Sequence, residues 1–156
     1  VRAFSALYDI QSWILRLSNM VGERTTHGIL FDFVKKVKKN KEELVVLGDG
    51  NQFKPYMYVG ELIDCMFFVI NNASERVNIF NVGPKDGVKV SVIAKIFLEH
   101  FGEGQKITYT GGQTGWKGDV PFYSHNSEKL NRLGWEPKLS SEAAIRKAVA
   151  RIKETI

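Results

Sequence analysis

The sequence predicts an α/β fold, because short apolar runs alternate along the chain with segments whose apolar residues recur at helical spacing. The chain has 156 residues, of which 44% are hydrophobic and 12% aromatic. This is enough for one core of ordinary size, so we expect a single domain over residues 1–156. Glycine, proline and asparagine fall between the periodic segments, where turns are needed.

Three elements are expected before residue 41. Residues 1–8 are typical of the end of a helix whose start signal is missing. Residues 13–17 form an apolar run, which is typical of a strand buried on both faces of a parallel sheet. Helical spacing of Ile29, Phe33 and Val37 then predicts a helix over residues 28–40.

A hairpin and a buried helix are expected next. Strands are predicted over residues 44–47 and 56–59, and Gly48-Asp49-Gly50-Asn51 between them has the composition of a tight turn. The helix that follows, residues 61–71, carries apolar residues on a broad face, and Cys65 and Phe68 extend that face. We therefore expect this helix to be buried almost all round.

The second half of the chain repeats the alternation of strands and helices. Ser91 is expected to cap a helix that ends at Gly102, and Gly134 is expected to end a short helix near the carboxyl end. The other expected elements are strands over residues 77–82 and 107–109, an ordered glycine-rich loop over residues 110–122, a helix over residues 127–133 and a helix from residue 140.

Composition limits the partners and the compartment. The formal charge is +5, but the lysines between residues 35 and 41 alternate with apolar residues, which favours a solvated helix face over a nucleic-acid stripe. No run approaches the roughly 18 apolar residues that cross a bilayer. Cys65 is the sole cysteine, which fits a reducing compartment. We expect a cytoplasmic protein without nucleic-acid or membrane partners.

Several well-known catalytic patterns are missing from the sequence. It contains no Gly-x-Gly-x-x-Gly turn, no Tyr-x-x-x-Lys pair and no Gly-x-Ser-x-Gly elbow. His27, His100 and His125 lie far apart, so no metal site is expected and each histidine is interpreted as a surface or loop residue. From the residues alone, the prediction stops at an α/β domain that could bind an anion.

Four segments carry more specific information. Residues 15–22 contain the pattern Arg-x-x-Asn-x-x-Gly, and residues 47–59 read Leu-Gly-Asp-Gly-Asn-Gln-Phe-Lys-Pro-Tyr-Met-Tyr-Val. Residues 115–121 contain Gly-Asp, and residues 130–137 contain Leu-Gly-Trp-x-Pro. In this order and spacing, the segments resemble the extended short-chain dehydrogenase/reductase family, and within it the UDP-glucose (galactose) 4-epimerase-like members of the NAD-dependent epimerases/dehydratases.

The resemblance implies both a fold and a set of binding roles. The chain would be the carboxyl-terminal part of an NAD(P)-binding Rossmann-like fold, holding the last sheet strands and a small substrate-binding α/β subdomain, with the dinucleotide-binding half absent. Leu17 and Ser18 would lie near the nicotinamide of NAD, and Asn19 would bind the sugar nucleotide. The other implied substrate-binding residues are Gly28 and Ile29 (backbone groups near phosphate), Val46, Leu47 and Val88 (around the base), Lys54 (the diphosphate) and Asp119 (the ribose or a basic neighbour).

Two positions depart from the family pattern. Lys54 stands where most members have an arginine, so it keeps the charge but loses the planar fork that grips phosphate in two places. Thr114 stands where close relatives have an arginine, and Lys117 could take over its contact with phosphate. Trp13, Trp116 and Trp135 are expected to be packing residues, although the loop of Trp116 should edge the pocket.

The resemblance therefore implies the UDP-sugar-binding half of an NAD-dependent 4-epimerase that holds substrate without supplying catalytic residues. The chain alone would be inactive. The resemblance also allows the full-length parent to form a homodimer, because homodimers are common in the family. Two alternatives remain: an NDP-sugar dehydratase or reductase, and a non-catalytic module left from a truncated gene. Read singly, Asn19, Lys54 and Asp119 are also explained as a loop residue, a solvated cation and a turn cap.

Overall fold

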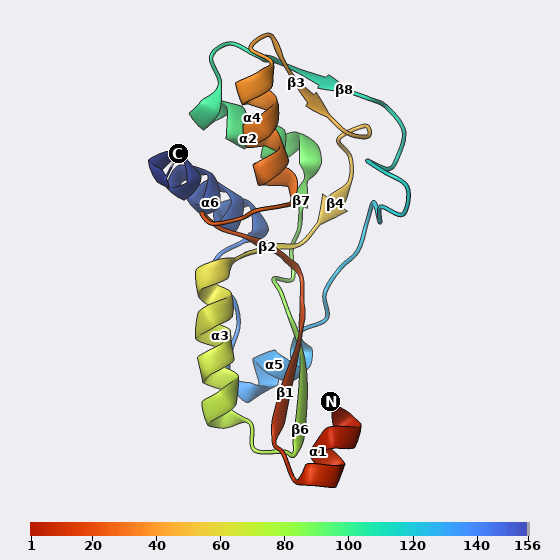
Figure 1. Ribbon diagram of the computed structural model, residues 1–156, viewed down its shortest axis with the longest axis vertical. Helices are drawn as coiled ribbons and strands as arrows, with labels where there is room; N and C mark the ends of the chain where they lie inside the picture. Colours follow the sequence, from red (N-terminus) through yellow and green to blue (C-terminus); the bar gives the residue numbers. More distant parts are fainter. Residues whose placement is uncertain (156) are drawn as a thin grey trace.

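Two clusters of buried apolar side chains organise the chain into two lobes, which the computed structural model describes over residues 1–155 (Figure 1). The lower lobe in this view holds α1 (Arg2–Tyr8), β1 (Ser12–Leu17), α3 (Val59–Asn72), β6 (Val77–Val82) and α5 (Glu128–Leu133). The upper lobe holds α2 (Ile29–Lys39), β3 (Glu43–Val46), α4 (Val90–Phe101), β8 (Lys106–Tyr109) and α6 (Ser141–Thr155). Between the lobes run β2 (Asn19–Val21), β4 (Phe53–Lys54), β5 (Tyr56–Tyr58) and β7 (Val88–Lys89).

The lower lobe is built on a parallel pair of strands. β1 pairs with β6 in register from Ser12 opposite Val77 to Leu17 opposite Val82. Cys65 and Val69 of α3 are fully buried in the cluster that also includes Phe80 of β6 and Leu130 of α5. The parallel pairing confirms one prediction for residues 13–17. The prediction of burial on both faces was wrong, because these residues are half-buried or exposed and Leu17 is exposed.

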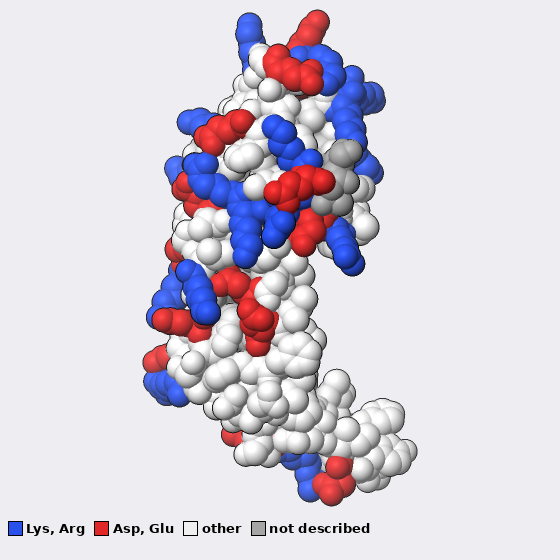
Figure 2. All heavy atoms as spheres, turned by 90° about the vertical axis from the view of Figure 1, so that its left-hand side faces the viewer, with Lys and Arg blue, Asp and Glu red and all other residues white. Residues whose placement is uncertain are grey.

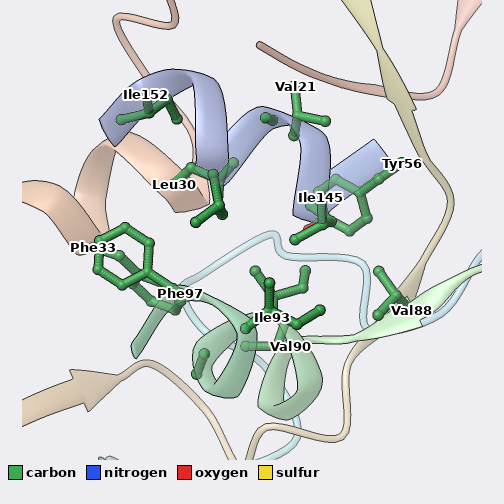
Figure 3. Close-up of a cluster of buried hydrophobic side chains, with 14 of the residues drawn as sticks. Val21, Leu30, Phe33, Tyr56, Val88, Val90, Ile93, Phe97, Ile145 and Ile152 are labelled. Atoms are coloured by element: carbon green, nitrogen blue, oxygen red, sulfur yellow. The ribbon is translucent and has the colours of Figure 1, made fainter. Parts of the chain in front are cut away.

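The upper lobe packs three helices around one core (Figure 3). In α2, residues Leu30, Phe33, Val34 and Val37 recur at helical spacing and are all buried, which confirms the predicted helix. Phe33 meets Phe97 of α4 edge to face, with ring centroids 5.5 Å apart. Lys36 of α2 is only 25% exposed and pairs with Asp32 one turn away at 2.7 Å. Lys35, Lys38 and Lys39 are exposed, whereas every buried residue of α2 is apolar.

The predicted hairpin between residues 44–47 and 56–59 was wrong. β3 pairs instead with β8, in parallel and with Glu43 opposite Lys106, and β5 pairs with β2, also in parallel. The turn glycines were recognised correctly, since Gly48 and Gly50 have φ of 82° and 78°. Turn chemistry fixes a local change of direction, whereas the partners of these strands lie far along the chain, at residues 106–109 and 19–21.

Two predictions about helices also need correction. α3 is not buried all round, because Ile63, Met66, Phe67 and Ile70 are 44–64% exposed. Ser91 does not cap α4, which begins one residue earlier at Val90. The first free N–H groups of α4 are satisfied by backbone instead: Val90 donates to the Gln52 carbonyl at 3.0 Å and Ser91 to the Gly50 carbonyl at 2.9 Å.

The carboxyl-terminal elements follow the prediction more closely. α5 ends at Gly134, whose φ of 108° is the left-handed conformation that glycine adopts readily. α6 begins at Ser141, one residue after the predicted start. It buries Ala144, Ile145, Ala148, Val149 and Ile152, whereas Ala143, which was also expected on its inner face, is half-buried. Across residues 1–155, no helix combines the length and the apolar character needed to cross a membrane.

Candidate nucleotide-binding cavity

A cavity of about 860 Å³ opens between the two lobes. Its walls come from four parts of the chain: the end of β1 with β2, the segment that leads into α2, the strands β3 to β5, and the loop at residues 115–119. These segments are separated in sequence by up to a hundred residues. The parallel pair β2–β5 brings the first of them to the same place as the third.

The most polar part of the wall is an ion pair. The Nζ of Lys54 lies 2.5 Å from Oδ1 of Asp119, and the two side chains are 11% and 2% exposed. The other carboxylate oxygen, Oδ2, accepts a hydrogen bond from the backbone N–H of Gly115 at 2.9 Å. Burial alone would raise the pKa of Asp119, but the hydrogen bonds from Lys54 and Gly115 and the positive charge of Lys54 outweigh it and lower the pKa. Asp119 is therefore an anion that holds Lys54 and the loop together.

The start of β2 forms an adjoining part of the wall, because Asn19 pairs with Tyr56 of β5. The backbone N–H and the side-chain Nδ2 of Asn19 both donate to the Pro55 carbonyl at 3.3 Å, which fixes the side chain beside β5. Ser18 is 6% exposed, and its hydroxyl has no hydrogen-bond partner among the described residues. Gly83 makes room for it, because a Cβ there would lie 2.8 Å from the Ser18 Oγ. Asn19 is thus anchored, and Ser18 is left with unused hydrogen-bonding capacity.

The start of α2 closes a third side of the cavity. Gly28 precedes the helix with φ of 85° and open space where a Cβ would be, and Ile29 begins it. The first N–H groups of an α-helix have no partner within the helix, and the helix dipole is positive at this end. Asp32 places a carboxylate in the same first turn, but its charge is shared with Lys36.

Nine of the eleven residues that the sequence predicted as site residues line this one cavity: Leu17, Ser18, Asn19, Gly28, Ile29, Val46, Leu47, Lys54 and Asp119. The other two lie elsewhere. Val88 is 4% exposed and packs in the core of the upper lobe with Val90 and Ile93, because β7 leads directly into α4 (Figure 3). Lys117 is exposed and lies outside the cavity lining, as does Thr114.

Other lining residues were missed by the sequence prediction. Gln52 and Tyr56 line the cavity on either side of Lys54, so the alternation of a strand around Lys54 could have found them. Both are buried, and burial raises the pKa of the Tyr56 phenol far above its ordinary value. Arg24 and His27 also line the cavity from loops, where no periodic signal marks them, and Trp116 lines it from the loop that was expected to edge the pocket.

Comparison with known proteins places the chain in a family. The sequence model of the NAD dependent epimerase/dehydratase family matches residues 1–83, more than half of the chain. The chain belongs to this family. Its likeness to extended short-chain dehydrogenases/reductases, first seen in four short segments, is thus confirmed over a continuous stretch that contains Asn19 and Lys54.

Curated relatives and solved structures support the same assignment. A UDP-glucose 4-epimerase-like protein of Methanocaldococcus jannaschii is 28% identical over 153 residues, which cover 96% of this chain and 48% of that protein. A UDP-galactose 4-epimerase structure superposes with a TM-score of 0.84 at 26% identity, over 99% of this chain and 49% of that one. The Thermotoga maritima UDP-glucose 4-epimerase, solved with UDP-glucose, gives a TM-score of 0.81 at 26% identity, over 99% and 50%. The chain spans about half the length of the proteins it matches.

Proposed function

We propose that this chain is the UDP-sugar-binding half of an NAD-dependent sugar-nucleotide 4-epimerase. One observation carries the proposal: Asn19 and Lys54, which lie on different strands, line a single cavity together with Asp119. The cavity has the size of a ligand site for a small organic molecule. The UDP-glucose bound to the Thermotoga maritima relative supports the choice of ligand.

In this proposal, the diphosphate binds between Lys54 and the start of α2. Lys54 supplies a positive charge, and the N–H groups near Gly28 and Ile29 supply hydrogen bonds of the kind that phosphate accepts. Asp119 acts on Lys54, whose ammonium it holds in place at 2.5 Å. The hexose then lies toward Asn19, and the nucleoside lies toward Val46 and Leu47.

NAD enters the proposal as the cofactor of the full-length protein, to which it supplies hydride chemistry. The residues of this chain do not fit the whole cofactor, because the sequence has no glycine-rich turn for its pyrophosphate. Leu17, which is 43% exposed, and Ser18, whose hydroxyl has no partner among the described residues, are the groups that would face its nicotinamide end. We therefore assign binding and orientation of the substrate to this half, and no catalytic residue.

Calorimetric titration of the chain with UDP tests the proposal. We expect binding, and we expect Lys54→Met to weaken it by about 10- to 100-fold, which corresponds to losing one hydrogen bond to a charged group. Lys117→Met is the matched control, because Lys117 is a nearby lysine outside the cavity lining. Circular dichroism of each variant establishes that the fold is retained.

The titration also separates the alternatives. Absence of UDP binding to the wild-type chain would contradict the proposal and favour a non-catalytic remnant. If Lys54→Met and Lys117→Met weakened UDP binding equally, the nucleotide would be attracted by the net positive charge of the chain and not by this cavity. A dehydratase or reductase of the same family would use the same cavity, and relatives such as the mouse dTDP-D-glucose 4,6-dehydratase, 25% identical, show why that alternative is kept.

A further inference from the structure

Trp116 differs from the other two tryptophans of the chain. Trp13 donates its indole N–H to the Ala73 carbonyl at 3.2 Å, and Trp135 packs against the core of the lower lobe. Trp116 is 60% exposed and lines the cavity. The packing role expected from the sequence therefore does not fit Trp116, because a large apolar ring left open to water beside a cavity is a common feature of binding sites.

The surroundings of Trp116 combine a cation with apolar surface. The Nζ of Lys54 lies 5.0 Å from the centroid of the indole ring. The preceding residue, Gly115, packs against Leu47, since a Cβ at Gly115 would lie 3.4 Å from the Leu47 Cβ. Leu47 is itself 40% exposed. A phosphate bound to Lys54 would thus bring whatever it is attached to next to two exposed apolar side chains.

The two ends of the cavity differ in chemistry, and this orients the ligand. Toward β1 and β2 the lining includes Asn19, whose side-chain amide suits a polyhydroxylated sugar. Toward β3 and the loop at residues 115–119 it offers Leu47 and Trp116, which suit a flat, weakly polar ring. Lys54 lines the cavity from the strand between these two walls.

We propose that Trp116 packs its indole against the pyrimidine ring of the bound nucleotide, opposite Leu47, and so fills the place that the resemblance had assigned to Val88. This inference rests on the proposed function and adds a base-contacting residue to it. The loop that carries Trp116 is held in place, because Gly115 donates to Asp119 Oδ2, and the Asp119 N–H donates to the Trp116 carbonyl at 3.1 Å across a turn in which Gly118 has φ of 89°. Aromatic contact with a base does not read its hydrogen bonds, so selectivity for the base comes from other groups.

The test compares ligands with and without a base. For Trp116→Ala, we expect the Kd of UDP to rise by about 5- to 150-fold, since one aromatic–base contact contributes about 1–3 kcal/mol. The Kd of ribose 5-diphosphate, which has no base, should stay the same, and Trp116→Phe should recover most of the affinity for UDP. Phe67→Ala is the matched control, because Phe67 is an aromatic residue of similar exposure, 64%, on α3 and outside the cavity lining.

Each outcome decides the inference. Unchanged UDP affinity in Trp116→Ala would overturn it while leaving the proposed function intact. Equal weakening of UDP and ribose 5-diphosphate would also overturn it, because Trp116 would then act through Lys54. A loss seen with UDP-glucose but not with UDP would move the contact to the hexose. If the wild-type chain bound none of these ligands, the proposed function would fail together with the inference.

Discussion

At the scale of single residues, the cavity depends on how a lysine is held where water is scarce. Lys54 and Asp119 have both lost most of their hydration, and each replaces it with a short contact to the other. Asp119 also satisfies the N–H of Gly115. Removing one partner of such a pair leaves the other charge without compensation, which costs more than the pair itself contributes.

Asp119→Asn should therefore destabilise the fold by about 3 kcal/mol near neutral pH, within the range for breaking a buried pair. The folded-state pKa of Asp119 is lowered, so its contribution is present above the unfolded pKa of about 3.9 and is lost as the pH falls through the folded value. Urea unfolding between pH 3 and pH 7 measures this. The difference in the free energy of unfolding between wild type and Asp119→Asn should be smaller at pH 3 than at pH 7.

Glu103→Gln provides the comparison for this experiment. Glu103 pairs with Lys41 at 3.0 Å, but both side chains are more than 60% exposed. Exposed pairs contribute little because water and salt screen them. The buried pair would not have the role described here if Asp119→Asn lowered the free energy of unfolding equally at every pH. The same conclusion would follow if it lowered that free energy no more than Glu103→Gln does.

Sequence reasoning was most successful for residues that belong to a patterned segment. Asn19, Lys54 and Asp119 were chosen from spaced motifs, and the structure brings all three to one cavity. It was least successful where burial decides the role. The loop of Trp116 was expected at the edge of the pocket, but the contact with the base was assigned to Val88, which packs in the core, because an apolar residue suits either place.

At the scale of elements, the predicted helices and strands were mostly correct, whereas the predicted hairpin pairing of residues 44–47 with 56–59 was wrong. Local spacing of apolar residues identified α2, β6, α5 and α6. The partners of β3 and β5 lie far along the chain, and no local feature specifies them. The exposed face of α3 was missed for a related reason, because an apolar face indicates burial without indicating what buries it.

The start of α6 is bonded to β5 and to Asp86, and this contact can be tested with two neighbouring serines. The Ser140 Oγ accepts a hydrogen bond from Ala143 N–H at 3.1 Å, an ordinary helix cap. The Ser141 Oγ is buried, accepts the Tyr56 N–H at 3.1 Å and contacts Asp86. Ser140→Ala should cost about 1 kcal/mol. Ser141→Ala should cost about 2–3 kcal/mol, because a buried N–H of β5 then has no partner.

Urea unfolding at neutral pH compares the two variants directly. If Ser141→Ala lowers the free energy of unfolding more than Ser140→Ala, this serine holds β5, the strand that directly follows Lys54 and Pro55. Equal losses would mean that Tyr56 N–H finds another acceptor when Ser141 is removed.

At the scale of the whole molecule, one face is unusually apolar. Charged side chains gather over the upper lobe, whereas the surface around α3 and α1 carries few of them (Figure 2). Ile63, Met66, Phe67 and Ile70 of α3 and Val1, Phe4, Leu7, Tyr8 and Ile10 around α1 are exposed. Because the chain spans about half the length of its relatives, we propose that an amino-terminal, dinucleotide-binding half of the full-length protein covers this face.

The chain on its own should then self-associate through α3. Phe67→Glu is expected to reduce the sedimentation-average mass toward that of a monomer, because a charge on this face opposes its burial against another copy. Val120→Glu is the control, since Val120 is 54% exposed but lies in the loop after β8. If Phe67→Glu and Val120→Glu changed the sedimentation-average mass equally, self-association would not occur through the exposed face of α3.

The central claim is that the cavity between the lobes holds the diphosphate of a sugar nucleotide at Lys54. A crystal structure of the chain with UDP tests this most directly. We expect phosphate oxygens within hydrogen-bonding distance of the Lys54 Nζ, and the Asn19 side chain lining the same occupied cavity. UDP bound outside this cavity, or inside it with the phosphates turned away from Lys54, would contradict the account.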